Sequence, residues 1–210
     1  MKGLFITLEG MDGVGKTTQL RKLEKYLTEK GYQIIVTREP GGTVISEKIR
    51  DIILDENHKE MDDVAEVFLY AAARSQHVAQ VIKPAVLQGK IVLCDRFVDS
   101  SIAYQGFGRQ LGMEFIEKIN QPALHGIEPD LTLYFHLDFP SWIERLSGRS
   151  DRRDRLEQED ISFHRRVYEG YKALLKKYPE RIKKIDAHWD VERVFEQVKN
   201  CFDCLLECHK

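Results

Sequence analysis

A glycine-rich segment near the start of the chain holds the first residues whose types and spacing could do chemistry. It reads Gly10-x-x-x-x-Gly15-Lys16-Thr17, between an apolar run and a helical pattern. The glycines let the backbone curl around an anion, and the N-terminus of the following helix adds a positive dipole end. Lys16 would reach the β- and γ-phosphates of a nucleotide, and the Thr17 hydroxyl would bind Mg²⁺. An ordinary turn before a helix could also be rich in glycine, but the spacing and the context together favour a P-loop.

Asp95 is a second candidate for the same chemistry. It follows the apolar run 91–94, and an acidic residue at the carboxyl end of a buried strand is typical of a Walker B carboxylate near Mg²⁺. It could instead cap the segment that follows it. The predicted metal ligands are thus Thr17 and Asp95. The predicted ATP-binding residues are Gly10, Met11, Asp12, Gly13, Val14, Gly15, Lys16, Thr17 and Thr18.

The pattern of apolar residues predicts the scaffold that must hold these groups. Five short, continuously apolar runs indicate strands that are buried on both faces, as in a parallel sheet. They lie at 4–8, 33–37, 91–94, 131–137 and 181–185. Helical patterns alternate with them, at 18–30 before Gly31, at 62–88, at 161–177 and from Asp190 onward. This alternation predicts a three-layer α/β P-loop NTPase fold, with a five-stranded parallel sheet flanked by helices, and a single domain over residues 1–210.

Composition argues against several function classes. Hydrophobic residues make up 42% and charged residues 31%, which is a globular balance, and no apolar run reaches the length that spans a membrane. The first residues lead into a strand without the pattern of a signal peptide, so we expect a cytoplasmic location and no membrane partner. A net charge of -2 provides no basic field to attract nucleic acid, so no nucleic-acid partner is expected.

The cysteines do not form an obvious metal motif. Cys201, Cys204 and Cys208 would need a fourth ligand, and His209 is adjacent to Cys208 rather than spaced as in a zinc site. A free cysteine commonly behaves as a small hydrophobe, so buried or idle thiols are the favoured interpretation and a metal site is the alternative.

Several polar segments predict an acceptor site at the mouth of the sheet. No Asn-Lys-x-Asp motif follows the run 131–137, which argues against a GTPase. The segments LEGMDGVGKTTQ, TREPGGT, AAARSQH, DRFVDSSIAYQG, PDLTLYFHLD and DRLEQED resemble, in this order, the blocks of the thymidylate kinase family, from residue 4 to about 178. DRFVDSSIAYQG is the most discriminating, because other nucleoside monophosphate kinases share the P-loop but not this string.

The resemblance implies an activity, and it implies roles for particular residues. A family member transfers the γ-phosphoryl group of ATP to dTMP with Mg²⁺, in dTTP synthesis, and is a homodimer. The resemblance implies that the dTMP phosphate is bound by Arg50 and Arg96. It implies that Tyr70 stacks on thymine, and that Arg74 and Gln105 form hydrogen bonds with the polar edges of this base. Tyr104 would lie near the sugar 2′ position, and Asp12 near the acceptor sugar or the metal. The implied substrate-binding residues are Asp12, Glu39, Arg50, Tyr70, Arg74, Arg96, Ser100, Tyr104 and Gln105.

Taken alone, three of these residues have ordinary explanations. Tyr70 lies close to the apolar stripe of its helix and could belong to the core. Arg74 could pair with Glu66 or another carboxylate, and Arg50 could be a solvated charge. The chain also departs from the family pattern at Tyr70, where Phe is usual, and at Val44-Ile45-Ser46, where the family often has Pro-Leu-Gly.

The basic segment 148–155 resembles the arginine-bearing lid of the bacterial type, and we expect a lid over about 147–157. None of the four residues between Gly10 and Gly15 is basic, so the charge that neutralises the transition state should come from this lid. Arg149 is the first candidate and Arg153 the second, and a solvated basic loop is the alternative. The predicted catalytic residues are Lys16, Arg96, Arg149 and Arg153.

Two competing functions stay open at this point. One is a kinase for another acceptor, such as dUMP, a different monophosphate or a nucleoside. The other is a nucleotide-dependent regulatory protein that retains the P-loop and turns over slowly. No general base is obvious in the sequence, and none is strictly needed for phosphoryl transfer, because a phosphate-monoester oxygen is already anionic near neutral pH and positioning supplies most of the catalysis.

Overall fold

The computed structural model describes residues 3–148 and 154–208, and strands and helices alternate along them. The strands are β1 (Phe5–Glu9), β2 (Ile34–Arg38), β3 (Ile91–Asp95), β4 (Leu131–His136) and β5 (Ile182–Asp186). The helices are α1 (Lys16–Glu29), α2 (Val44–Leu54), α3 (Asp63–His77), α4 (Lys83–Leu87), α5 (Val98–Ser101), α6 (Met113–Ala123), α7 (Phe139–Ser147), α8 (Ile161–Lys177) and α9 (Val191–Cys208). Two π-helical segments, η1 (Val78–Ile82) and η2 (Ile102–Gly108), extend α3 and α5.

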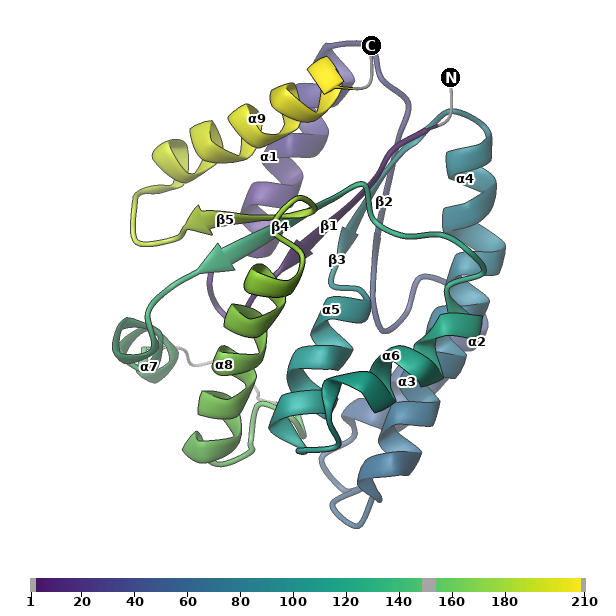
Figure 1. The fold of residues 1–210 in the computed structure, drawn as a ribbon, viewed down its shortest axis with the longest axis vertical. Helices are drawn as coiled ribbons and strands as arrows, with labels where there is room; N and C mark the ends of the chain where they lie inside the picture. The colour runs from purple at the N-terminus through teal and green to yellow at the C-terminus, as the bar shows by residue number, and fades with distance from the viewer. Residues whose placement is uncertain (1–2, 149–153, 209–210) are drawn as a thin grey trace.

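A single parallel sheet joins all five strands in the order β2-β3-β1-β4-β5. The predicted five-stranded parallel sheet is therefore confirmed. β1 lies at the centre, so the end of the P-loop strand has a neighbour on each side, with Leu8 beside Asp95 and Glu9 beside Tyr134. The strands run from the end of the molecule that carries both termini toward α5, α7 and α8 (Figure 1).

Side chains of β1 alternate between the two faces of the sheet, and each face has its own helices. Ile6 and Leu8 pack in one buried cluster with Leu23 of α1. Phe5 belongs to a second cluster, with Val86 of α4. The sheet is thus covered on both faces, which explains why its strands read as continuous apolar runs. None of the helices within residues 3–148 and 154–208 has the length and apolar character needed to cross a bilayer.

Four strands extend one residue beyond the predicted apolar run, and the added residue is polar each time. The added residues are Glu9, Arg38, Asp95 and Asp186. Ladder hydrogen bonds come from the backbone, so pairing continues past the last apolar side chain. Polar side chains are thereby held on rigid strands at the edge where the site lies.

The predicted helix over 62–88 needs a correction. Its helical path is continuous, but α3 passes into the π-helical segment η1 before α4 begins. Pro84 lies in the first turn of α4 and has no N–H group to donate to the carbonyl group of Gln80. The local change from α to π geometry falls in the turn where an α-helix would need that hydrogen bond.

His188 joins the strand ends to the helix that precedes residues 149–153. Its Nε2 lies 2.5 Å from Asp138 Oδ2, and its Nδ1 lies 2.6 Å from Asp186 Oδ1. Asp138 is also the N-cap of α7, where it accepts the Ser141 N–H group. From α7, the Trp142 indole donates to the Asp12 carbonyl oxygen in the P-loop at 2.8 Å. His188 therefore helps to fix the helix that supports the loop.

We predict that His188 makes stability depend on pH. Hydrogen bonds to Asp138 and then Asp186 raise the pKa of His188. A raised folded-state pKa stabilises the protein fully below the unfolded value of about 6.5, and the stabilisation is lost as pH rises through the folded-state pKa. The difference in unfolding free energy between wild type and His188→Gln should be larger at about pH 6 than at about pH 9. Urea denaturation measures this difference. The control is His58→Gln, because His58 Nδ1 contacts only a backbone carbonyl oxygen, and an equal pH dependence in both variants would contradict the prediction.

Candidate active site

The loop between β1 and α1 is shaped by glycines. Gly10, Gly13 and Gly15 have φ angles of 140°, 79° and 92°, in the region that L side chains rarely adopt. A β-carbon on Gly10 would lie 2.6 Å from the Phe135 carbonyl oxygen, so the loop could approach β4 only with glycine there. α1 begins at Lys16, and the N–H groups of its first turn lack intrahelical acceptors. The loop thus offers N–H groups to an anion.

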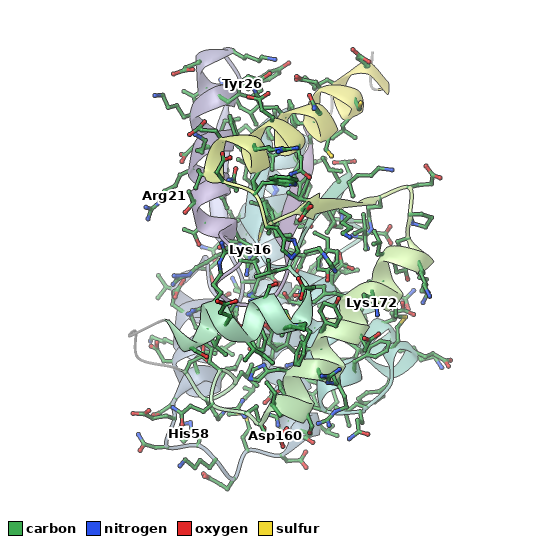
Figure 2. All side chains as sticks on the ribbon, turned by 90° about the vertical axis from the view of Figure 1, so that its left-hand side faces the viewer. Lys16, Arg21, Tyr26, His58, Asp160 and Lys172 are labelled. Atoms are coloured by element: carbon green, nitrogen blue, oxygen red, sulfur yellow. The ribbon has the colours of Figure 1, made fainter. Side chains whose placement is uncertain are left out.

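Lys16 is held over this loop. Its Nζ donates to the Gly10 and Met11 carbonyl oxygens at 3.0 and 2.9 Å. Burial, followed by the nearby Arg96 charge, lowers the pKa of Lys16 to about 8. Lys16 lies at the inner end of α1, near the middle of the molecule, whereas Arg21 and Tyr26 lie farther along the helix (Figure 2). A phosphate oxygen would be a stronger acceptor for this ammonium group than the two carbonyl oxygens.

Thr17 and Asp95 lie side by side, as the sequence predicts. The Thr17 hydroxyl donates to Asp95 Oδ2 at 3.1 Å, so two oxygen ligands meet at the start of α1 and the end of β3. Mg²⁺ prefers oxygen ligands and commonly takes one or two from protein, with phosphate and water completing its shell. The residue types and their spacing therefore fit Mg²⁺ bound together with a nucleotide. The described residues contain no group of three or more His, Cys, Asp or Glu side chains placed to hold a metal ion.

None of the cysteine side chains that the structure describes lines the cavity of this site, although Cys94 Sγ donates to the Arg96 carbonyl oxygen at 3.0 Å. Cys94 is buried, Cys201 is half-buried and Cys204 is exposed. Burial raises the pKa of the Cys94 and Cys201 thiols, which disfavours the reactive thiolate. The side chain of Cys208 lies outside the described part of the structure.

A cavity of about 450 Å³ opens at the carboxyl edge of the sheet and continues from the P-loop toward α2, α3 and η2. Most of the predicted site residues line it. They are Asp12, Gly13, Gly15, Lys16, Thr17, Thr18, Glu39, Arg50, Tyr70, Arg74, Asp95, Arg96, Ser100, Tyr104 and Gln105. Gly10, Met11 and Val14 are not among the lining residues, and the side chains of Met11 and Val14 pack in the core instead. From these three residues only the backbone is available to a nucleotide.

Arg96 lies where the P-loop and the rest of the cavity meet. Its NH2 group donates to the Asp12 carboxylate and to the Tyr104 hydroxyl, and the Tyr104 hydroxyl donates a hydrogen bond to Asp12 Oδ2 at 2.9 Å. Burial opposes the charges, but Arg96 and then Lys16 lower the pKa of Asp12, and Asp12 raises that of Arg96. Both groups are therefore ionised at neutral pH.

A buried carboxylate, that of Glu9, binds residues that contact Arg96. Glu9 is fully buried at the end of β1, and burial followed by the Asp99 charge raises its pKa to about 7. It accepts hydrogen bonds from the backbone of Phe97 and from the hydroxyls of Ser100 and Tyr171. The sequence analysis missed Glu9 and Tyr171 because Glu9 ends an apolar run and Tyr171 lies on an apolar helical stripe. The one available signal was a charged residue directly before the P-loop.

Arg74 forms one wall of the cavity through a buried network. Its Nε donates to Glu39 at 2.7 Å, and its NH groups donate to Asn120 and Ser101. His77 contacts the other oxygen of Glu39 at 3.1 Å. Arg74 thus pairs with a carboxylate, but with Glu39 rather than Glu66, and its contact with a base stays a prediction. Neither Asn120 nor His77 was singled out from the sequence.

Glu66 lies on the same helix as Arg74, α3, and contacts another residue that lines the cavity, Gln105. It is fully buried, and its carboxylate accepts from Gln105 Nε2 at 2.8 Å and from the guanidinium groups of Arg109 and Arg155. The amide N–H₂ group of Gln105 is therefore turned toward Glu66. Arg155 belongs to the predicted lid segment, yet it is buried and also donates to the Ile53 carbonyl oxygen at 2.9 Å.

Arg50 and Tyr70 stand on neighbouring helices, α2 and α3. Arg50 NH1 donates to the Pro40 carbonyl oxygen at 2.8 Å, and burial followed by Arg38 lowers its pKa. Tyr70 is half-buried and packs against the main core, and burial raises the pKa of its hydroxyl. Both residues also line the cavity. Tyr70 therefore packs against the core with part of its side chain and faces the cavity with another part.

Comparison with known proteins decides the family. The family model described as thymidylate kinase matches residues 8–198. The chain belongs to the thymidylate kinase family. It is 50% identical over 199 residues to the thymidylate kinase of Clostridium novyi (strain NT), which covers 94% of this chain and 97% of that one. It is 48% identical over 210 residues to the thymidylate kinase of Exiguobacterium sibiricum, covering 100% and 98%.

A solved structure agrees with this assignment. The crystal structure of thymidylate kinase from Ehrlichia chaffeensis superposes with a TM-score of 0.79 at 33% sequence identity, covering 97% of this chain and 99% of that one. The chain therefore has both the sequence and the fold of a thymidylate kinase. The individual site residues stay predictions, and Arg149 and Arg153 lie outside the described residues.

We predict that Glu66 contributes strongly to stability, because it is the buried carboxylate that Arg109 and Arg155 share. Glu66→Gln leaves two arginines without their buried carboxylate, which should lower the free energy of unfolding by about 3 to 5 kcal/mol. Glu114→Gln is the matched control, because Glu114 forms an exposed pair with Lys118 and its loss should change stability by less than about 1 kcal/mol. Chemical denaturation of the two variants tests this, and equal effects would contradict it.

Proposed function

We propose that the protein is an ATP:dTMP phosphotransferase that forms dTDP and ADP, a step of dTTP synthesis. The observation that carries the proposal is the continuous cavity in which the P-loop meets the acceptor-side residues. Asp12 and Lys16 line one end of it, and Arg50, Tyr70 and Arg74 line the other. Membership of the thymidylate kinase family supports dTMP as the acceptor and ATP as the donor.

On the donor side, the P-loop would hold the ATP phosphates. The N–H groups at the start of α1 and the Lys16 ammonium would bind the β- and γ-phosphate oxygens. The Thr17 hydroxyl and the Asp95 carboxylate, 3.1 Å apart, would hold Mg²⁺. When bound, Mg²⁺ neutralises charge on the phosphate oxygens.

On the acceptor side, the arginines and the aromatic ring of Tyr70 would bind different parts of dTMP. Arg96 and Arg50 would bind the 5′-phosphate, because a guanidinium group matches phosphate oxygens in pairs. The Tyr70 ring would stack on thymine, with Arg74 and Gln105 at its polar edges. Arg74 donates to Glu39, and Arg96 donates to Ser100. These two acceptors would therefore lie next to the ligand and orient the arginines that bind it.

Two groups remain near the sugar. The Tyr104 hydroxyl donates to Asp12, so a carboxylate and an aromatic ring stand together beside Arg96. We infer that Asp12 lies near the acceptor sugar or the metal and that the Tyr104 ring disfavours a 2′-hydroxyl group. Phosphoryl transfer then depends mainly on holding the two phosphates in line in a site from which water is excluded.

The remaining expectations concern the whole chain. We propose a single kinase domain over residues 1–210 with a lid over about 147–157, in a cytoplasmic enzyme. We also propose a homodimer. Exposed apolar side chains on α2 and α3 support a second copy as partner, because such residues on adjoining helices are typical of a subunit interface. They are Val44, Ile45, Ile52 and Phe68.

The central prediction is acceptor selectivity. With ATP and Mg²⁺, the protein should phosphorylate dTMP in preference to dUMP, dCMP, dGMP and thymidine, each offered separately beside a control without acceptor. Chromatography of the nucleotide products measures this. Preferential phosphorylation of another acceptor would replace dTMP in the proposal, and ADP release without a phosphorylated acceptor would favour a regulatory P-loop protein.

A second prediction concerns the lid arginines. If Arg149 neutralises the transition state, Arg149→Ala should lower kcat by about 10³-fold or more with little change in the KM for dTMP, as expected for an arginine that acts in phosphoryl transfer. Arg153→Ala is the alternative, and Arg145→Ala, on the exposed side of α7, is the matched control. Steady-state kinetics of the three variants compares them. A kcat within about tenfold of wild type for both lid variants would show that neither arginine has this role.

A further inference from the structure

Glu9 is a fully buried carboxylate directly before the P-loop, and the proposed reaction gives it no task. It accepts four hydrogen bonds from three residues. Oε1 accepts from the Phe97 and Ser100 N–H groups at 2.7 and 3.3 Å. Oε2 accepts from the Ser100 and Tyr171 hydroxyls at 2.6 and 3.0 Å. These donors lie around Arg96. Phe97 and Ser100 follow it directly in the chain, and Tyr171 reaches it from α8.

The same two hydroxyls also contact the Arg96 guanidinium group. Its NH1 group donates to Ser100 Oγ at 3.1 Å and to the Tyr171 hydroxyl at 3.1 Å. A hydroxyl has one proton and two lone pairs. The two hydroxyls lie 3.0 Å apart, but a carboxylate is a stronger acceptor than a hydroxyl, so both protons point to Glu9. Their lone pairs are then left for Arg96, which can only donate.

Glu9 also acts on the backbone that carries Arg96. Arg96 has a φ of 70°, in the left-handed region that costs energy for residues other than glycine. The Arg96 N–H group bonds to the Leu8 carbonyl oxygen, and the next N–H group, that of Phe97, bonds to Glu9. The carboxylate therefore anchors the turn and the guanidinium group of the same residue.

We propose that Glu9 is a positioning residue for the acceptor phosphate, because it orients the Ser100 and Tyr171 hydroxyls as acceptors and so sets the direction of Arg96 in the cavity. This inference rests on the proposed function, in which Arg96 binds the 5′-phosphate. Glu9 itself does not touch the substrate. Its effect should therefore appear in the use of dTMP and not in the binding of ATP.

An amide of the same shape cannot replace this carboxylate. In Glu9→Gln, an amide nitrogen at the Oε1 position would face two N–H donors, Phe97 and Ser100. At the Oε2 position the amide nitrogen would donate to the Ser100 and Tyr171 hydroxyls, so the protons of these hydroxyls would no longer point toward residue 9. Either arrangement disturbs Arg96 without removing side-chain volume. Tyr171→Phe and Ser100→Ala each remove one of the two connections.

The test compares steady-state kinetics of wild type, Glu9→Gln, Tyr171→Phe and Ser100→Ala with ATP–Mg²⁺ and dTMP. Assays are run at about pH 8, above the pKa of Glu9 and above the second ionisation of dTMP at about pH 6. Each variant should lower kcat/KM for dTMP by about 10- to 100-fold, the range expected for a hydrogen bond to a charged group, with the KM for ATP unchanged within about twofold.

Tyr134→Phe is the matched control. The Tyr134 ring is buried and stacks on Tyr171 at 5.2 Å, but its hydroxyl is not among the groups around Arg96. It should keep kcat/KM for dTMP within about twofold of wild type. A double-mutant cycle adds a sharper readout. If Glu9 acts through Tyr171, the loss in the double variant Glu9→Gln/Tyr171→Phe should be smaller than the product of the single losses.

Three results would overturn the proposal. One is an unchanged kcat/KM for dTMP in the variants, the second is an equal loss for ATP and dTMP, and the third is strictly multiplicative losses in the cycle. Thermal denaturation shows whether Glu9→Gln is folded. If it is not folded, the kcat/KM for dTMP and the KM for ATP of Tyr171→Phe and Ser100→Ala test the proposal in its place. A wild type that forms no dTDP would overturn the proposed function and this inference together, whereas an active wild type with unaffected variants would overturn this inference alone.

Discussion

The site depends on holding two positive charges side by side in a largely buried cavity. Lys16 is buried and Arg96 is half-buried, and burial followed by the Arg96 charge lowers the pKa of Lys16. The protein compensates in two ways: carbonyl oxygens of the P-loop accept from Lys16, and the Asp12 carboxylate accepts from Arg96. The carbonyl oxygens are neutral acceptors and therefore weaker partners for Lys16 than phosphate oxygens would be, so an anionic ligand would strengthen the hydrogen bonds of this ammonium group.

The parallel sheet makes this arrangement possible. Adjacent parallel strands end at the same edge, and β1, β3 and β2 each end in a charged residue, Glu9, Asp95 and Arg38. The loop that follows β1 leads to Lys16 at the start of α1, and Arg96 directly follows β3, so the two cations are placed by strands that pair directly. Ligand sites at the carboxyl ends of the strands are general in open α/β sheets.

Buried ion pairs hold or adjoin several of the residues that line the cavity. Glu39 pairs with Arg74, and both line the cavity. Glu66 pairs with Arg109 and Arg155 and also accepts a hydrogen bond from Gln105, which lines the cavity. A buried pair adds little net stability, but removing one partner leaves an uncompensated charge, so the geometry of such a pair is strongly constrained. The result is a cavity whose polar groups have set directions before any ligand arrives, which reduces the ordering required on binding.

The amino-acid sequence by itself determined the strand positions to within about one residue, the parallel sheet and the P-loop, because these depend on local apolar periodicity and on glycine spacing. It also singled out Arg74 and Gln105, and it allowed Arg74 to pair with Glu66 or another carboxylate, but it did not identify Glu39 as that partner. Glu9, Tyr171 and Asn120 gave no clear signal, since each interacts with a residue far away in the chain. Only the tertiary structure decided these partners, because the hydrogen bonds of a buried polar group depend on which distant segments the packing brings within about 3 Å of it.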